Sequence, residues 1–195
     1  MDDPSSFFCW FIPLILVVGL VVSAINGAKK EEEKKAQAEN KLNTHKSTLH
    51  NTDFVSSKHI QLPALSIEVR IDLEHQKLAI LSSLHSNVII IMFSDILHSE
   101  IVQDNSTIMG GGIGRAIAGG IIAGGAGAIV GATTRKSKDV VSDLRIKITT
   151  TNISNPLITV KLITSQTEKS SSLYQQCIEF AEEVQATIES IISQQ

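Results

Sequence analysis

The sequence predicts an α+β protein with an N-terminal transmembrane helix, a small antiparallel β barrel or bent sheet that carries a glycine-rich insertion, and one C-terminal helix. Three observations predict this class. A long apolar run without charge stands near the N-terminus, short segments in the middle alternate apolar and polar residues, and the last segment repeats its apolar residues every three or four positions. A chain of 195 residues has room for one such domain and an appendage.

Composition narrows the functional classes. The chain has 17 basic and 20 acidic side chains, and its formal net charge is −3. Because a nucleic-acid-binding domain normally carries clustered positive charge, we expect no nucleic-acid partner. Two cysteines cannot form a disulfide framework and show no metal-ligand spacing, which favours a reducing compartment.

The N-terminal apolar run covers residues 7–25, FFCWFIPLILVVGLVVSAI, and contains no charge. A helix of that length is about 28 Å long, close to the thickness of the hydrocarbon core of a bilayer. A cleavable signal peptide is disfavoured because the preceding MDDPSS has no basic residue and the apolar run is too long, although Val22-Ser23-Ala24 resembles a cleavage site. We therefore expect residues 1–27 to be a permanent transmembrane anchor.

The charges beside this span predict its orientation. Only acidic residues precede the span, whereas Lys29 and Lys30 follow it closely. Positive charge marks the cytoplasmic side, so we expect a single-pass protein whose N-terminus is outside the cell and whose bulk is cytoplasmic. Lys29 and Lys30 would then face the lipid headgroups.

Residues 28–52 predict a charged helical stalk followed by a linker. The first part, AKKEEEKKAQAENKL, consists of strong helix formers. It has almost no apolar residue, so no coiled-coil seam can be drawn. The polar residues of the second part, 43–52, predict a linker. We interpret the whole region as a solvated spacer.

Residues 53–195 predict the cytoplasmic β domain. Three segments alternate apolar and polar residues, and three aliphatic runs are bounded by turn-forming residues. We expect strands at residues 67–71, 77–82, 87–92, 96–103, 144–148 and 158–162. The loop 152–156, NISNP, predicts a hairpin between the last two of them. In total we expect about six or seven strands.

Residues 171–193 predict one amphipathic helix. Ser172 and Gln175 have the spacing of a capping box, and an apolar stripe runs along the segment, made of Leu173, Cys177, Phe180 or Ala181, Val184, Ile188 and Ile191. Cys177 has no basic neighbour in sequence, so we expect a core residue and not a reactive thiol. Antiparallel strands closed by one helix resemble, in element order, the pleckstrin-homology (PH) architecture, which hosts many functions.

The glycine-rich segment covers residues 110–134 and holds ten of the twelve glycines. Small residues recur at every fourth position, so a helix here would carry the small-xxx-small surface by which helices pack closely in a bilayer. We expect that packing to involve Gly120, Gly124, Gly127 and Gly131. The segment lacks the Gly-Lys-Ser/Thr ending of a phosphate-binding loop.

Three arrangements of this segment stay open. A second spanning helix would put the flanking strands on opposite sides of the membrane. A helical hairpin that bends at Gly124-Gly125 keeps both flanks cytoplasmic and brings the basic residues Arg135, Lys136 and Lys138 to the headgroups. The third arrangement is an apolar connection that packs on its own domain or on a second copy of the chain.

The order of these motifs resembles an uncharacterised family of bacterial proteins. The resemblance covers about residues 96–192 and is carried by the strand 96–104, the glycine-rich run ending at Gly131, the strand 144–148, Asn155-Pro156 and the closing helix. In that family the module often follows a small zinc-ribbon-like or short helical domain, whereas here a membrane anchor precedes it. The resemblance implies a bacterial source, hence the inner membrane, and brings no catalytic residue.

No motif predicts catalysis. The six histidines are irregularly spaced without a zinc pattern, and we expect them at the surface or in turns. We therefore expect no cofactor, no metal and no enzyme activity. The predicted function is a membrane-anchored binding or scaffolding module of unknown ligand, whose partners are the lipid bilayer and a protein or a second copy. The alternative is a membrane-active or channel-blocking protein, of the prophage-exclusion or toxin-immunity type, that acts through the glycine-rich segment.

Overall fold

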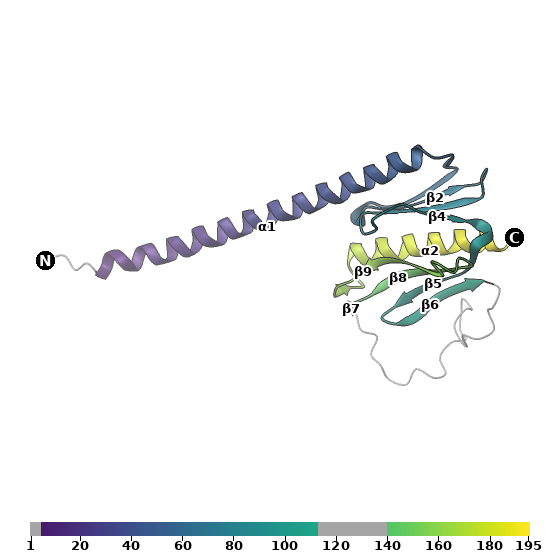
Figure 1. Cartoon of the computed structure of the whole chain (residues 1–195). Helices are drawn as coiled ribbons and strands as arrows, with labels where there is room; N and C mark the ends of the chain where they lie inside the picture. The colour runs from purple at the N-terminus through teal and green to yellow at the C-terminus, as the bar shows by residue number, and fades with distance from the viewer. Residues whose placement is uncertain (1–4, 113–139) are drawn as a thin grey trace, which may run out of the picture.

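The structure is a computed structural model that describes residues 5–112 and 140–195, with side chains for residues 25–110 and 140–195 (Figure 1). It confirms the α+β class with antiparallel sheets and a C-terminal helix. The elements are two helices, ten strands and two short 3-10 turns in the described part of the chain.

Two four-stranded antiparallel sheets form the body of the domain. The first sheet has the order β1-β2-β3-β4 and consists of β1 (Lys58–Leu62), β2 (Ile67–Asp72), β3 (Lys77–Ser82) and β4 (Ile89–Met92). The second sheet has the order β6-β5-β8-β9 and consists of β5 (Ile96–Gln103), β6 (Ser106–Gly112), β8 (Leu144–Thr150) and β9 (Leu157–Ile163). The short strands β7 (Val140–Val141) and β10 (Thr167–Glu168) pair with each other. The turns are η1 (Pro63–Leu65) and η2 (Phe93–Asp95).

The helix α2 (Ser172–Ile192) lies between the two sheets (Figure 1). Its apolar stripe is buried in one core with the inner faces of both sheets, as expected, with Phe180, Val184 and Ile188 among the core residues. Two details of the prediction are wrong. The N-cap is Ser171, whose side chain accepts a hydrogen bond from the Tyr174 backbone N–H, and Leu173 is 36% exposed.

The predicted bounds of β3 and β5 are confirmed, and the other predicted strands agree within a few residues. The loop 152–156 joins β8 and β9 in the expected hairpin. Asp104 and Asn105 connect β5 to β6 with φ values of 47° and 65°. A two-residue hairpin turn of this kind needs residues that tolerate positive φ, and Asp and Asn do so. The sequence prediction missed β1, β6, β7 and β10.

The helix α1 (Ser5–His50) runs without interruption into the region predicted to be a linker (Figure 1). That prediction is wrong because the last turns of α1 pack on the outer face of the first sheet. Leu42 and Leu49 are buried there against Ala79 and Leu81 of β3. The end of the stalk is therefore part of the folded domain and not a solvated spacer.

The predicted transmembrane span at residues 7–25 belongs to α1, but all of its side chains except that of Ile25 lie outside the described residues. Among the residues that the structure describes, no helix contains an apolar stretch long enough to cross a membrane. Residues 25–41 are exposed except for the half-buried Ala38. The transmembrane anchor thus stays a prediction.

Candidate binding site

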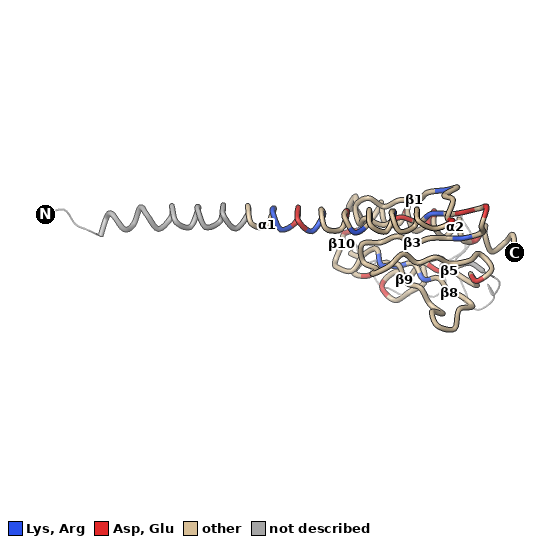
Figure 2. Tube along the Cα trace, turned by 45° about the horizontal axis from the view of Figure 1, so that its top comes forward, with Lys and Arg blue, Asp and Glu red and all other residues tan. Residues whose placement is uncertain are grey.

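The residues predicted to contact the membrane are only partly described. Gly120, Gly124, Gly127 and Gly131, together with Arg135, Lys136 and Lys138, lie outside the described residues. Lys29 and Lys30 are exposed on the part of α1 that stands clear of the domain (Figure 2). At 1.5 Å per helical residue, Lys29 lies about 20 Å from Leu42, where burial begins.

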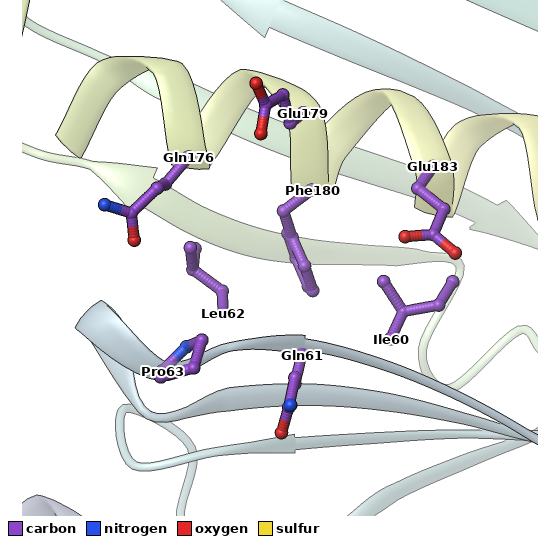
Figure 3. Close-up of a pocket in the computed structure, with 8 residues that line it drawn as sticks. All are labelled: Ile60, Gln61, Leu62, Pro63, Gln176, Glu179, Phe180 and Glu183. Atoms are coloured by element: carbon purple, nitrogen blue, oxygen red, sulfur yellow. The ribbon is translucent and has the colours of Figure 1, made fainter. Parts of the chain in front are cut away.

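A groove runs between β1 and α2, and we call it the β1–α2 groove. It encloses about 190 Å³ and has Ile60, Leu62 and Phe180 as its floor. Figure 3 shows Phe180 pointing from α2 toward β1, while Gln61 points away from α2. Gln176, Glu179 and Glu183 of α2 line the other side. The groove therefore has an apolar floor beneath a polar rim.

One end of the groove is held by a polar contact between β1 and α2. The Lys58 Nζ lies 3.1 Å from Glu183 Oε1 and donates a hydrogen bond of 3.0 Å to Thr187 Oγ1. Glu179 is exposed and has no ion pair or hydrogen bond through its side chain within the described part of the chain. The rim thus offers one paired and one unpaired carboxylate.

A second cavity, of about 180 Å³, lies beneath α1. Glu39, Leu42 and Lys46 line it from α1, and Glu68 lines it from β2. It shares Gln61 and Pro63 with the β1–α2 groove, so the segment where β1 passes into η1 lines both hollows.

The carboxylate of Glu68 joins α1 to the first sheet. Its side chain is only 4% exposed, and its oxygens lie 2.6 Å from Lys46 Nζ, 2.9 Å from Arg70 Nη2 and 3.1 Å from His59 Nε2. Burial raises the pKa of Glu68, but the hydrogen bonds from Lys46 and Arg70 outweigh this effect and hold that pKa below its usual value. The charge of Glu68 is compensated, as a buried carboxylate requires.

The histidines are not all at the surface, which corrects the prediction. His45, a residue of α1, is 4% exposed, and its Nε2 lies 3.3 Å from the carbonyl oxygen of Ser86. Burial lowers the pKa of His85, in the loop before β4. Of the two, His45 lies in the segment 43–52 that the sequence prediction treated as a linker. Leu42, His45 and Leu49, at helical spacings of three and four, were the signal for the docking of this end of α1.

Metal-ligating side chains are not gathered in the described part of the chain, and the cysteine described there is buried. Among the described residues there is no cluster of three or more His, Cys, Asp or Glu side chains that could hold a metal ion. Cys177 is buried in the core, as expected, and burial raises the pKa of its thiol to about 11. Such a thiol is protonated at neutral pH and is a poor nucleophile. The described site offers surfaces for binding: a groove with an apolar floor, a rim with two carboxylates, and the outer edge of β1, which is the first strand of its sheet.

A family model described as "Glycine zipper containing PH domain" matches residues 53–164. This range includes both four-stranded sheets and the glycine-rich segment and ends before α2. It confirms the β-rich module with a glycine-rich segment and the PH-like order of elements; the zinc-ribbon-like neighbour is no part of the match. The comparison with curated proteins gives no match, and neither does the comparison with solved structures.

Proposed function

The chain belongs to the family of PH domains that contain a glycine zipper, and from this premise we propose that it is a binding or scaffolding module, without enzyme activity, held at a fixed position on the cytoplasmic side of a bacterial inner membrane. The observation that carries the proposal is the continuity of α1 from Ser5 to His50, with its last turns packed on β3. A flexible linker would let the domain tumble freely. A docked helix instead fixes the distance and the orientation of the domain.

In this proposal, residues 7–25 span the bilayer with the N-terminus outside. Lys29 and Lys30 then lie at the headgroups of the inner leaflet, where each basic residue gains on the order of 1 kcal/mol from anionic lipid. The exposed turns that follow hold the first docked residue, Leu42, about 20 Å further along the helix. The interaction between Lys46 and the buried Glu68 supports this arrangement, because it ties the helix to the sheet by charge as well as by apolar contact.

The glycine-rich segment provides a second, weaker membrane contact in this proposal. β7, the strand that follows this segment, lies at the end of the domain nearer to the N-terminus of α1 (Figure 1). Arg135, Lys136 and Lys138 precede β7 by a few residues in the sequence, and in this proposal they contact the lipid headgroups. When one contact holds the chain at the membrane, the effective concentration of the second contact site at the leaflet rises.

Fractionation of cells that express the full chain and a variant without residues 1–27 tests the anchor. We expect the full chain to stay in the membrane fraction after carbonate extraction and the shortened variant to be released. The proposal is wrong if the mature protein is recovered from the periplasm with its N-terminus near Ile25. Accessibility to a membrane-impermeant thiol reagent, with single cysteines at Pro4 and Asn40, tests the orientation: only position 4 should react in intact cells.

The alternative function, a membrane-active protein, makes a different prediction. The triple substitution Gly120→Leu, Gly124→Leu and Gly127→Leu removes the small-residue surface that such a protein needs. Two assays compare the native chain with the triple variant: dye release from vesicles to which the protein is added, and growth of cells that express it. If the native chain releases dye or slows growth and the triple variant does neither, the result favours the membrane-active protein over the tethered module. We expect neither chain to leak dye.

A further inference from the structure

We propose that the β1–α2 groove binds an extended basic peptide of a partner protein, which adds as a fifth strand to the free edge of β1. The inference rests on the proposed function, because it names the partner class that a binding module of this kind would hold. Three properties of the groove carry it: a strand edge, a small apolar floor and an acidic rim.

The strand edge is the outer side of β1. β1 is the first strand of its sheet and pairs with β2 from Lys58 to Leu62 on one side only. No main-chain hydrogen bond reaches its other edge from the described residues, so alternate N–H and C=O groups there lack a main-chain partner; the Lys58 carbonyl accepts a hydrogen bond of 3.5 Å from Ser56 Oγ. An extended peptide that aligns with such an edge gains main-chain hydrogen bonds independently of its sequence.

The size of the floor favours side chains over a small-molecule ligand. The groove encloses about 190 Å³, whereas pockets for drug-sized ligands usually enclose about 300–1,000 Å³. An extended peptide directs every second side chain to the same face. A peptide on β1 would therefore place one or two side chains over Leu62 and Phe180. Because both residues are already almost fully buried, the main-chain hydrogen bonds would supply most of the affinity.

The charges select a basic peptide. Two of the four glutamates of α2, Glu179 and Glu183, line the groove, and α2 has no Lys or Arg between Ser172 and Ile192. Glu179 is unpaired in the described part of the chain, while the nearby cations Lys58 and Lys46 are engaged by Glu183 and Glu68. The rim is therefore negative, and Lys or Arg residues that alternate with apolar ones complement it.

The same charges argue against a second copy of the chain in the groove. A symmetric pairing of two β1 edges would bring the acidic rims of both copies together, and like charges across such an interface are repulsive. The basic residues Arg135, Lys136 and Lys138 of this chain are a further possible occupant. Both become outcomes of the experiment.

The test measures binding of fluorescent peptides to the full chain in an uncharged detergent. The probe alternates lysine with valine, and the control peptide alternates glutamate with valine. We expect the lysine peptide to bind and Glu179→Arg to weaken its binding about fivefold to tenfold. Glu182→Arg is the matched variant, because Glu182 is exposed on α2 but does not line the groove. We expect Glu182→Arg to change the affinity less than twofold, because exposed charges outside the groove interact only weakly with the peptide.

Methylation of the peptide nitrogens tests strand addition directly. Methyl groups on one alternate set of amides should abolish binding, and methyl groups on the other set should leave it, because only one set faces β1. The proposal is wrong if both peptides bind alike, if both α2 variants act alike, or if methylation has the same effect on both sets. It is also wrong if the lysine peptide does not bind.

Two further outcomes identify another occupant. If the chain sediments as a dimer and the Glu179→Arg variant sediments with a different oligomeric mass, a second copy fills the groove. If the peptide binds only after Arg135, Lys136 and Lys138 are changed to Ser, the chain fills its own groove. Either result overturns the proposal. Carbonate extraction of the Glu179→Arg variant separates this inference from the proposed function. Release of the chain from the membrane would contradict the proposed anchor, whereas loss of peptide binding alone would concern only the groove.

Discussion

The two four-stranded sheets differ in what covers their outer faces. In the first sheet, α1 covers the face opposite the core, so β3 is buried on both faces: Leu78 and Ile80 face the core, and Ala79 and Leu81 face α1. In the second sheet, residues of β8 alternate between buried and half-buried positions. An alternating sequence normally indicates a strand with one face in solvent. Where α1 docks, the second face of the strand is covered as well, so a polar residue on that face is not solvated.

The charged residues of the two sheets illustrate this point. Glu68 in β2 is 4% exposed and meets three cationic or titratable side chains. Glu100 in β5 has a side chain that is 25% exposed, and it lies 3.3 Å from Lys147. The first interaction holds two elements together, whereas the second joins neighbouring strands that already pair. Their contributions to stability should differ accordingly.

The largest expected effect is that of Leu49→Ala. Leu49 is 2% exposed where α1 packs on β3, and removal of its side chain should lower the free energy of unfolding by about 2–3 kcal/mol. Urea unfolding measures the loss. Hydrogen exchange should show faster opening of β3 than of β8. Leu157→Ala in β9, where the side chain is 49% exposed, is the control and should cost less than about 0.5 kcal/mol.

Glu68→Gln should follow, with a loss of about 2 kcal/mol, because it leaves Lys46 and Arg70 without their buried charge partner while both can still reach solvent. The matched change Glu100→Gln in the second sheet should cost about 0.5 kcal/mol. If both variants lost the same free energy of unfolding in urea, the docking of α1 would not depend on the Glu68 carboxylate.

Ser171→Ala should destabilise the protein by about 1 kcal/mol, because it removes the N-cap of α2. Since α2 packs on both sheets, we expect hydrogen exchange to accelerate equally in β3 and β8. A response confined to one sheet would show that α2 does not couple them. Ser172→Ala, one residue later, is the control, because its side chain does not accept the capping hydrogen bond.

Acid should loosen the first sheet before it unfolds the domain. The pKa of Glu68 is lower in the folded chain than its usual value. Its stabilising contribution is therefore complete above the ordinary glutamate pKa of about 4.3 and is lost as the pH falls through the lowered value. Urea midpoints between neutral pH and pH about 3 should fall. Glu68→Gln should remove part of that slope, and an unchanged slope would contradict the assignment.

The sequence predicted the elements whose local signals agree with their tertiary surroundings. β3 and β5 combine aliphatic runs with clear turns, and the apolar stripe of α2 is continuous. β6 was missed because STIMGGG ends in glycines, which disfavour strands; its pairing with β5 stabilises it. β1 has only two apolar residues, Ile60 and Leu62, and needs β2 beside it.

The end of α1 was missed for a different reason. Its hydroxyl residues are weak helix formers, but in the structure they donate hydrogen bonds to carbonyls four residues earlier, as Thr44, Ser47 and Thr48 do. Docking on β3 provides the stability that propensity lacks. The β1–α2 groove was not predictable either, because its two walls are more than 100 residues apart in the sequence.

The unbroken course of α1 also ties the length of the chain to the direction in which the domain faces. Each residue inserted among the exposed turns, between Lys30 and Lys41, would rotate everything beyond it by about 100° while moving it only about 1.5 Å along the helix axis. Two added residues would swing the groove toward the opposite side of the helix axis, and seven, about two full turns, would nearly restore its heading. In the proposed membrane-anchored arrangement, the number of residues in the stalk therefore sets which neighbouring proteins can reach β1.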